Sequence, residues 1–473
     1  MTVYTDKDPI VAIATAPGRG GVGIIRLSAS DEVIQAFIAK YFAGQRLLKA
    51  RFAHLRTFHD VNNQVIDEGL ALYFPAPKSY TGESVLELQG HGGPVVLRLL
   101  LETVLDVGKE WGMRLAEPGE FTKRAFLNGR LDLSQAEAVA DLIDATTEGA
   151  ARAASRSLNG KFSEKIHEIA SAVIELRALI EAILDFPEEE IDFIKSTHAR
   201  ERMQDIVSQY DALMHMSQQG SILREGVTAV LVGSPNVGKS SLMNYLSGAD
   251  VAIVTEVAGT TRDKIENEVN LGGVALRLVD TAGVRNTEDK VEAIGIERTL
   301  QAVEKADVVL HLFDATAELT DDEGAATLEK VRSRIKRGVP VINVLNKCDL
   351  TDHLSVNDLN VIKISAKTGQ GIDELKKRLL DIVGWENNLE ATFLARERHL
   401  QALARGKEHL MLAQSFVLIE PPPMDLLAEE LRLVNSQLGE VIGETTPDDI
   451  LDIIFSRFCI GTVSYTHLTL PTT

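Results

Sequence analysis

The chain has 473 residues, of which 45% are hydrophobic and 25% are charged, and both fractions are ordinary for a globular protein. This length exceeds what one hydrophobic core usually organises, so roughly two to four domains are expected. The formal charge of −20 argues against broad, non-specific nucleic-acid binding, because the phosphate backbone attracts basic surfaces.

Cysteine usage and hydropathy indicate the compartment. The two cysteines, Cys348 and Cys459, give neither a disulfide framework nor a metal cluster, and they fit a reducing cytosol. The first residues, MTVYTDKDPIVAIATAPGRGG, lack a long apolar stretch and predict no signal peptide. No uncharged apolar run approaches the roughly 20 residues that cross a bilayer. We therefore expect a cytoplasmic protein without a membrane partner.

Residues 1–128 are rich in glycine and in short strand-like runs, namely IVAIATAP, GIIRLS, GLALYF and SVLELQG. This pattern predicts a small α+β domain. From about residue 131 the spacing of apolar residues becomes helical, and Ser134 with Glu137 predicts a capping box. Amphipathic helices then continue to about residue 218, with one interruption at DFPEEEID. We assign residues 129–222 to the first part of a helical domain.

The stretch SQQGSILREG, residues 217–226, predicts a linker. After it, strand-like runs alternate with helices, which favours a mostly parallel α/β sheet over residues 223–385. Residues 386–461 are helical again, with a break at residues 421–423, PPP. The expected protein is multidomain, with an α/β domain inserted between two helical stretches. The pattern leaves open whether those two stretches pack together.

A phosphate-binding loop is predicted at GSPNVGKS, which follows the strand-like VTAVLV and precedes the helical SLMNYLSG. Glycines allow backbone N–H groups to turn toward the phosphates. Lys239 supplies charge to the β- and γ-phosphates, and the Ser240 hydroxyl is a ligand for Mg²⁺. The residues of this loop that we expect to contact nucleotide are Asn236, Val237, Gly238, Lys239, Ser240 and Ser241.

Three further motifs, each following its own strand, indicate which nucleotide binds. Asp280 begins DTAG, where it can reach Mg²⁺ through water and Gly283 can sense the γ-phosphate. In NKCD, the Asp349 carboxylate matches the imino and amino hydrogens of guanine, whereas adenine presents the wrong pattern. SAK can contact the guanine carbonyl through its backbone. The sequence therefore predicts a Ras-like GTP-binding domain, with contacts from Asp280, Thr281, Ala282, Gly283, Asn346, Lys347, Asp349, Ser365, Ala366 and Lys367.

The residue after DTAG is Val284, where the Ras pattern has a glutamine that orients the attacking water. Either this chain does not hydrolyse nucleotide, or other groups position the water and offset the developing charge. The segment DVAIVTEVAGTTRD, residues 250–263, places Thr260 and Thr261 where a switch loop supplies a Mg²⁺ ligand and a γ-phosphate sensor.

These features together resemble the MnmE (TrmE) family of tRNA-modification GTPases. The resemblance rests on Asn236 in the phosphate loop, on TEVAGTTRD and on the hydrophobic residue after DTAG. It extends to APGRGGVGIIRLS, YTGESVLELQGHGGP, PGEFTKRAFLNGRLDLSQAEAVADLIDA and FCIG, and so covers about residues 9–461. The N-terminal motifs are specific to this family among GTPases.

The resemblance implies that two GTPase domains meet head to head and that K⁺ beside the phosphates takes the place of an arginine finger. It implies Mg²⁺ ligands Ser240 and Thr261, K⁺ ligands Asn236, Thr255, Val257 and Thr260, and catalytic roles for Lys239 and Glu292. Glu292 would orient the attacking water through a bridging water. Its own sequence context predicts only a solvated charge on a helix. Further GTP contacts are implied for Thr255, Glu256, Val257, Ala258, Gly259, Thr260 and Thr261.

The resemblance also implies a homodimer with a site in the N-terminal domain for a tetrahydrofolate derivative, in its 5-formyl or methylene form. The matching positions are Arg26, Glu87 and Arg130; family members often have lysine at the last. By themselves, Arg26 and Glu87 read as ordinary charges on a strand face. Cys459 matches a residue linked to the modification site. The family chain ends CIGK, whereas here Thr462 replaces the lysine and residues 462–473 match nothing in the family.

The function implied is a K⁺-activated GTPase that acts with the flavoprotein MnmG (GidA), which carries FAD and uses NADH, in a heterotetramer or larger assembly. Together they would install a carboxymethylaminomethyl group on carbon 5 of the wobble uridine of certain tRNAs. One alternative is a ribosome-assembly GTPase, for which an appended basic RNA-binding domain would be expected. The other is a folate-dependent aminomethyltransferase whose GTPase domain only regulates it.

Overall fold

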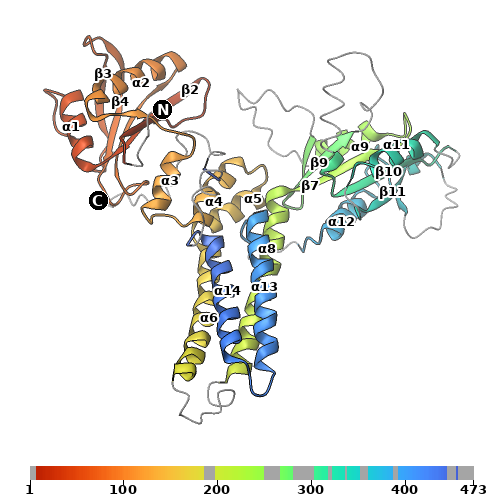
Figure 1. Ribbon diagram of the computed structural model, residues 1–473. Coiled ribbons are helices and arrows are strands. Elements are labelled where there is room, and N and C mark those ends of the chain that lie inside the picture. The colour runs from red at the N-terminus through yellow and green to blue at the C-terminus, as the bar shows by residue number, and fades with distance from the viewer. Residues whose placement is uncertain are drawn as a thin grey trace.

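A computed structural model describes residues 7–185, 198–249, 267–280, 303–317, 322–335, 338–351, 361–386, 392–444 and 454–455. Figure 1 shows a long bundle of helices with one sheet domain on either side of its upper end. The N-terminal domain lies on one side, in red and orange, and the second sheet domain lies on the other, in green and teal. None of the described helices combines the length and apolar character that a membrane span requires.

The N-terminal domain contains a six-stranded sheet in the order β3-β4-β5-β2-β1-β6. Neighbours pair antiparallel except β1 and β6. The strands are β1 (Ile10–Ile13), β2 (Gly20–Ala29), β3 (His54–His59), β4 (Val65–Phe74), β5 (Ser84–Gly92) and β6 (Arg114–Leu115). The helices are α1 (Asp31–Tyr41), α2 (Pro94–Gly108) and the 3₁₀ helix η1 (Lys109–Trp111). The predicted α+β character and all four predicted strands are confirmed, while β3 and β6 were not predicted.

Three short helices, α3 (Glu120–Leu127), α4 (Leu133–Asp144) and α5 (Glu148–Leu158), lead from this domain to the bundle. The helical pattern predicted from residue 131 is confirmed, but the predicted capping box is wrong. Asp132 caps α4 by accepting from the Gln135 amide, and the Gln135 side chain accepts from the Asp132 amide. Ser134 and Glu137 lie inside the helix and are buried.

The bundle consists of α6 (Lys161–Asp185), α8 (Ala199–Glu225), α13 (Glu397–Val417) and α14 (Met424–Ile442). The two helical stretches, far apart in sequence, therefore share one hydrophobic core. The linker predicted at residues 217–226 is wrong, because α8 continues to Glu225. Gly220 is needed for close packing instead: a Cβ there would collide with the Phe393 carbonyl oxygen.

The second sheet domain has the strand order β12-β11-β10-β7-β9-β8. All its pairings are parallel except that of β8 with β9, so the predicted mostly parallel sheet is confirmed. The strands are β7 (Val227–Val232), β8 (Asn267–Leu271), β9 (Val274–Asp280), β10 (Val308–Asp314), β11 (Val341–Asn346) and β12 (Val361–Lys363). The helices are α9 (Lys239–Ala249), α11 (Asp322–Arg332), α12 (Ile372–Val383) and the 3₁₀ helix η3 (Cys348–Leu350).

A buried charge network joins α4 to α13. The Glu137 carboxylate accepts hydrogen bonds from Arg398 at 2.7 and 2.8 Å and contacts His399 Nε2 at 2.8 Å. Burial alone would raise the pKa of Glu137, but the charges and hydrogen bonds of His399 and Arg398 hold it well below its ordinary value. The network fixes the C-terminal helices against the helix that follows the N-terminal domain.

A candidate GTP-binding site

The phosphate loop lies between β7, whose residues are all buried, and the first turn of α9. Gly233, Asn236 and Gly238 have φ angles of 148°, 64° and 97°, a region that favours glycine and tolerates asparagine. The Lys239 ammonium donates to the carbonyls of Gly233 and Ser234 at 2.6 and 3.0 Å, so it lies over the loop. A helix N-terminus preceded by such a loop attracts anions, because its first amides have no partner within the helix.

Asn346 connects the phosphate loop to both base-binding motifs. Its side chain donates to the Val237 carbonyl at 2.8 Å and accepts from the Ala366 amide at 3.0 Å. It is 2% exposed, and a Cβ at Gly238 would collide with its Nδ2 atom. The predicted bracing role of Asn346 thus has a definite geometry, and Gly238 is required because the amide approaches so closely.

Lys347 is held by a partner that the sequence analysis did not identify. Its ammonium lies 2.5 Å from the Asp314 carboxylate at the end of β10. Burial acts to raise the pKa of Asp314, but hydrogen bonds from Lys347 and Thr316 outweigh it and hold the pKa below its ordinary value. The only signal for Asp314 in the sequence is its place at a strand end, which is shared by Asp280.

Backbone hydrogen bonds hold both motifs that are predicted to bind the base, NKCD and SAK. The Cys348 amide donates to the Ile364 carbonyl at 3.1 Å, and the Ser365 amide donates to the Gln370 carbonyl at 2.9 Å. Asp349, in η3, is exposed, so its carboxylate is open to a ligand. Ser240, in the first turn of α9, is also exposed. Ser241, beside it, and Lys367, in the SAK motif, are further predicted contacts that lie on described segments.

Asp280 ends β9 and pairs in register with Leu231 of β7, so it lies beside the strand that leads into the phosphate loop. The remaining predicted residues of the switch segments lie outside the described part of the chain. They are Thr255, Glu256, Val257, Ala258, Gly259, Thr260, Thr261, Thr281, Ala282, Gly283, Val284 and Glu292, and Cys459 with residues 462–473 lies outside it as well.

In the N-terminal domain, the predicted folate residues Arg26 and Glu87 contact each other. Neighbouring strands β2 and β5 place them in register, and the Arg26 guanidinium donates to the Glu87 carboxylate at 2.8 Å. Both residues are 2% exposed, Gln89 also donates to Glu87 at 3.0 Å, and the Phe121 ring lies 6.0 Å from the guanidinium. The two charges are therefore a buried pair, not the exposed strand-face charges of the simpler interpretation.

Arg130 lies near the same face of the sheet. A Cβ at Gly82 would be 3.2 Å from the Arg130 Cγ, and the adjacent Thr81 hydroxyl bonds Ser28, two residues along β2 from Arg26. The Arg130 Nε atom is buried without a hydrogen-bond partner within the described segments. An unsatisfied buried donor of this kind is costly, and an anionic or polar ligand would satisfy it.

A polar cluster in this region was missed by the sequence analysis. The Glu83 carboxylate accepts from Ser28 at 2.7 Å and from Arg124 at 2.9 Å, and Arg124 also bonds Glu120 at 2.8 Å. Its members come from β2, the loop before β5, and α3, so no local sequence pattern reveals that they meet.

Fold and site together define a P-loop GTPase: a mostly parallel sheet, a glycine-containing phosphate loop at a helix N-terminus, and two loops, predicted to bind the base, that are tied to it through Asn346. Two family models match the chain, the MnmE helical domain over residues 133–459 and the GTP-binding protein TrmE N-terminus over residues 9–130. The chain is therefore a GTP hydrolase that belongs to the MnmE (TrmE) family.

Two similar proteins match this chain over nearly its whole length. A tRNA modification GTPase MnmE from Burkholderia cenocepacia (strain HI2424) is 53% identical over 466 residues, 97% of this chain and 99% of that protein. One from Paraburkholderia xenovorans (strain LB400) is 52% identical over the same shares. Among solved structures, the FeoB G-domain from Methanococcus jannaschii is 30% identical over 33% of this chain and 97% of that chain, with a TM-score of 0.25.

Proposed function

We propose that this protein is a K⁺-activated GTPase that modifies tRNA. With an MnmG-type flavoprotein carrying FAD and using NADH, a homodimer of it would install the carboxymethylaminomethyl group on carbon 5 of the wobble uridine. GTP hydrolysis would drive conformational change. The observation that carries this proposal is the identity of 53% over 97% of the chain to a tRNA modification GTPase, together with the hydrogen bonds by which Asn346 ties the phosphate loop to the Ala366 amide.

The residues present in the phosphate loop fit a monovalent cation. Asn236 is exposed, and its side-chain amide has no hydrogen-bond partner among the residues that the structure describes. An amide oxygen is a suitable ligand for K⁺, and the bound cation would supply positive charge toward the transferred phosphoryl group. Thr255, Val257 and Thr260 would complete the K⁺ site, Ser240 and Thr261 would hold Mg²⁺, and Glu292 would orient the water.

The N-terminal residues fit a folate in part. Arg130 has an unsatisfied buried donor, which suits a polar or carboxylate group of the cofactor. Glu87 already accepts hydrogen bonds from Arg26 and Gln89 in a closed site. A pterin bound through Glu87 would therefore have to share or displace one of these donors. Bound 5-formyl- or methylene-tetrahydrofolate would supply the one-carbon unit, and Cys459 would lie at the modification site.

The direct test of K⁺ activation is GTP turnover by the purified protein, with potassium titrated against sodium at constant ionic strength. We expect turnover to rise with potassium and to stay near its basal rate in sodium. Equal rates in the two salts would refute K⁺ activation. The tRNA function is tested separately, by nucleoside analysis of tRNA from a deletion strain; a normal level of the modified wobble uridine would exclude it.

A further inference from the structure

The N-terminal domain contains a basic segment within an acidic chain. Aspartate and glutamate outnumber lysine and arginine by 69 to 49 in the whole sequence, yet residues 33–59 contain no aspartate or glutamate. The same residues contain Lys40, Arg46, Lys49, Arg51 and Arg56. A local excess of positive charge therefore exists, although the formal charge of −20 argues against broad binding of nucleic acid.

The structure places most of these cations along one edge of the N-terminal sheet. β3 is the terminal strand of the described sheet, and Figure 1 shows it on the side of the domain away from the helical bundle. The Arg56 guanidinium, on β3, donates to the Arg46 carbonyl at 2.5 Å. The Arg51 guanidinium donates to the carbonyl of Lys78, which follows β4. We call this group the basic edge, and it consists of Arg46, Lys49, Arg51, Arg56 and Lys78.

The loop before β3 has a defined conformation. The Lys49 amide donates to His54 Nε2 at 2.7 Å, and the Lys49 ammonium lies 3.9 Å from the centre of the exposed Phe52 ring. Arg51 has φ 64°, a region that is unfavourable for most residues other than glycine and asparagine. Its amide donates to the Tyr73 carbonyl at 2.8 Å, which holds this conformation. Strained backbone clusters at binding sites, so the loop has a feature beyond what a connection from α1 to β3 requires.

None of the five cations of the basic edge pairs with a carboxylate within the described part of the chain. Exposed cations elsewhere do form such pairs, for example Lys161 with Glu164. Charged side chains on an edge strand can prevent edge-to-edge association of sheets. That role does not account for Arg46, Lys49 and Lys78, since these exposed residues lie outside β3 and β4. Unpaired positive charges at one edge instead favour a polyanionic partner.

The basic edge adjoins the sheet face that carries the proposed folate site. Leu55 of β3 pairs in register with Leu70 of β4, and Leu70 pairs with Gln89 of β5. Because residues opposite each other in neighbouring strands share a face, the exposed Leu55 lies on the same face as Gln89, which donates to Glu87. Two strand spacings, about 10 Å, separate β3 from β5. An RNA held by its phosphates at the edge can therefore extend a base over this face.

We propose that the basic edge binds the phosphate backbone of the tRNA substrate and directs its anticodon loop toward the Arg26–Glu87 face. This inference rests on the proposed tRNA function and assigns RNA binding to a particular surface of the chain. The exposed Phe52 ring beside Lys49 offers a stacking surface for an unpaired base, and stacking on aromatic side chains is a common way in which bases of RNA loops are recognised.

The test is binding of a fluorescently labelled, unmodified tRNA transcript with uridine at the wobble position to the full-length protein, measured by anisotropy over a series of salt concentrations. The edge variant carries Arg46→Gln, Lys49→Gln and Lys78→Gln, because these three side chains are exposed. Each phosphate contact contributes about 0.7–0.9 to the slope of log affinity against log salt. We expect the slope of the edge variant to be shallower by about two to three, and its affinity in low salt to fall at least about tenfold.

The matched control removes the same formal charge from the helical domain, with Arg152→Gln, Lys161→Gln and Lys165→Gln, which all form exposed ion pairs. It should bind the transcript as the wild type does. Both variants should retain GTP turnover, which reports that they are folded.

Unchanged affinity and salt dependence in the edge variant, or an equal loss in the control, would overturn the proposal. An altered oligomeric state in sedimentation velocity, with tRNA binding unchanged, would also overturn it and would assign the edge to contact between copies of the chain. Failure here is distinguishable from failure of the proposed function, because the latter would appear as normal modification of the wobble uridine in the deletion strain.

Discussion

Replacing Asn346 with alanine should weaken guanine-nucleotide binding without changing which base is preferred. The substitution removes the hydrogen bonds to the Val237 carbonyl and from the Ala366 amide, both within a buried site. At about 1 kcal/mol net for each bond, the loss is about 2 kcal/mol. Because nucleotide binding must then restore the order of the phosphate and base loops, this loss of free energy corresponds to roughly 30-fold weaker affinity for both GDP and GTP.

The assay is titration of a fluorescent guanine nucleotide, with competition by GTP, xanthosine triphosphate and ATP. Asn343→Ala is the matched control, because Asn343 lies on the same strand, β11, and its side chain makes none of these contacts. Its affinity should equal that of the wild type. Unchanged affinity in Asn346→Ala, or a change of base preference, would refute the bridging role.

The other predictions concern the base, the cation, the folate and the fold. Asp349→Asn should weaken GTP binding and shift preference toward xanthosine nucleotide, because the amide turns an acceptor into a donor; competition titration measures it, and unchanged GTP affinity would contradict it. Asn236→Ala should remove most of the potassium stimulation while nucleotide binding survives, whereas Glu292→Ala should slow turnover at saturating potassium; turnover assays that show the reverse pattern would contradict both roles. Glu87→Ala in the full-length protein should abolish calorimetrically measured binding of 5-formyltetrahydrofolate, and retained binding would remove Glu87 from the site. Glu137→Gln should cost about 3 kcal/mol of unfolding free energy in denaturant titrations at neutral pH, the lower end of the range for a buried ion pair, because it removes the charge that the partly buried Arg398 pairs with. Since the pKa of Glu137 is lowered in the folded state, its contribution is complete above the unfolded pKa of about 4.5 and is lost as the pH falls further, so the variant should lack this part of the acid dependence.

The sequence by itself determined the features that depend on neighbouring residues. The run VTAVLV followed by GSPNVGKS specifies a buried strand, a glycine-containing turn and a helix start, and the structure has all three. The alternation of strand-like runs with helices over residues 223–385 likewise predicted the mostly parallel sheet. Short-range patterns are reliable here because the backbone conformation of a loop or strand is set largely by its own residues.

Some assignments failed because distant residues decide them. The stretch SQQGSILREG was predicted to be a linker, but α8 continues through it to Glu225, and the close approach of the Phe393 carbonyl makes glycine necessary at position 220. Ser134 and Glu137 fit a capping box by spacing, yet Asp132 takes the cap and Glu137 binds Arg398 and His399 of α13. The sequence gives no sign of that partner, more than 250 residues away.

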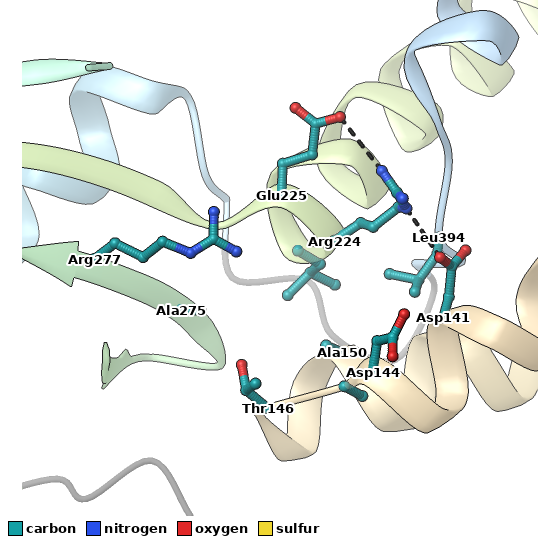
Figure 2. A pocket seen from close by; sticks show the side chains of 11 residues that line it. Asp141, Asp144, Thr146, Ala150, Arg224, Glu225, Ala275, Arg277 and Leu394 are labelled. Carbon is teal, nitrogen blue, oxygen red and sulfur yellow. Dashed lines mark hydrogen bonds and ion pairs between the residues drawn. The ribbon is translucent and has the colours of Figure 1, made fainter. Parts of the chain in front are cut away.

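Only the tertiary structure decided which charged groups meet. Sheet register places Arg26 beside Glu87, and the shared core of the bundle brings helices from both ends of the chain together. A pocket lined by Asp141, Asp144, Arg224 and Arg277 likewise combines residues of α4, α8 and β9, which are far apart in the sequence (Figure 2). The physical reason is that packing contacts and ion pairs depend on distance in space, whereas the sequence patterns that can be recognised extend over only a few residues.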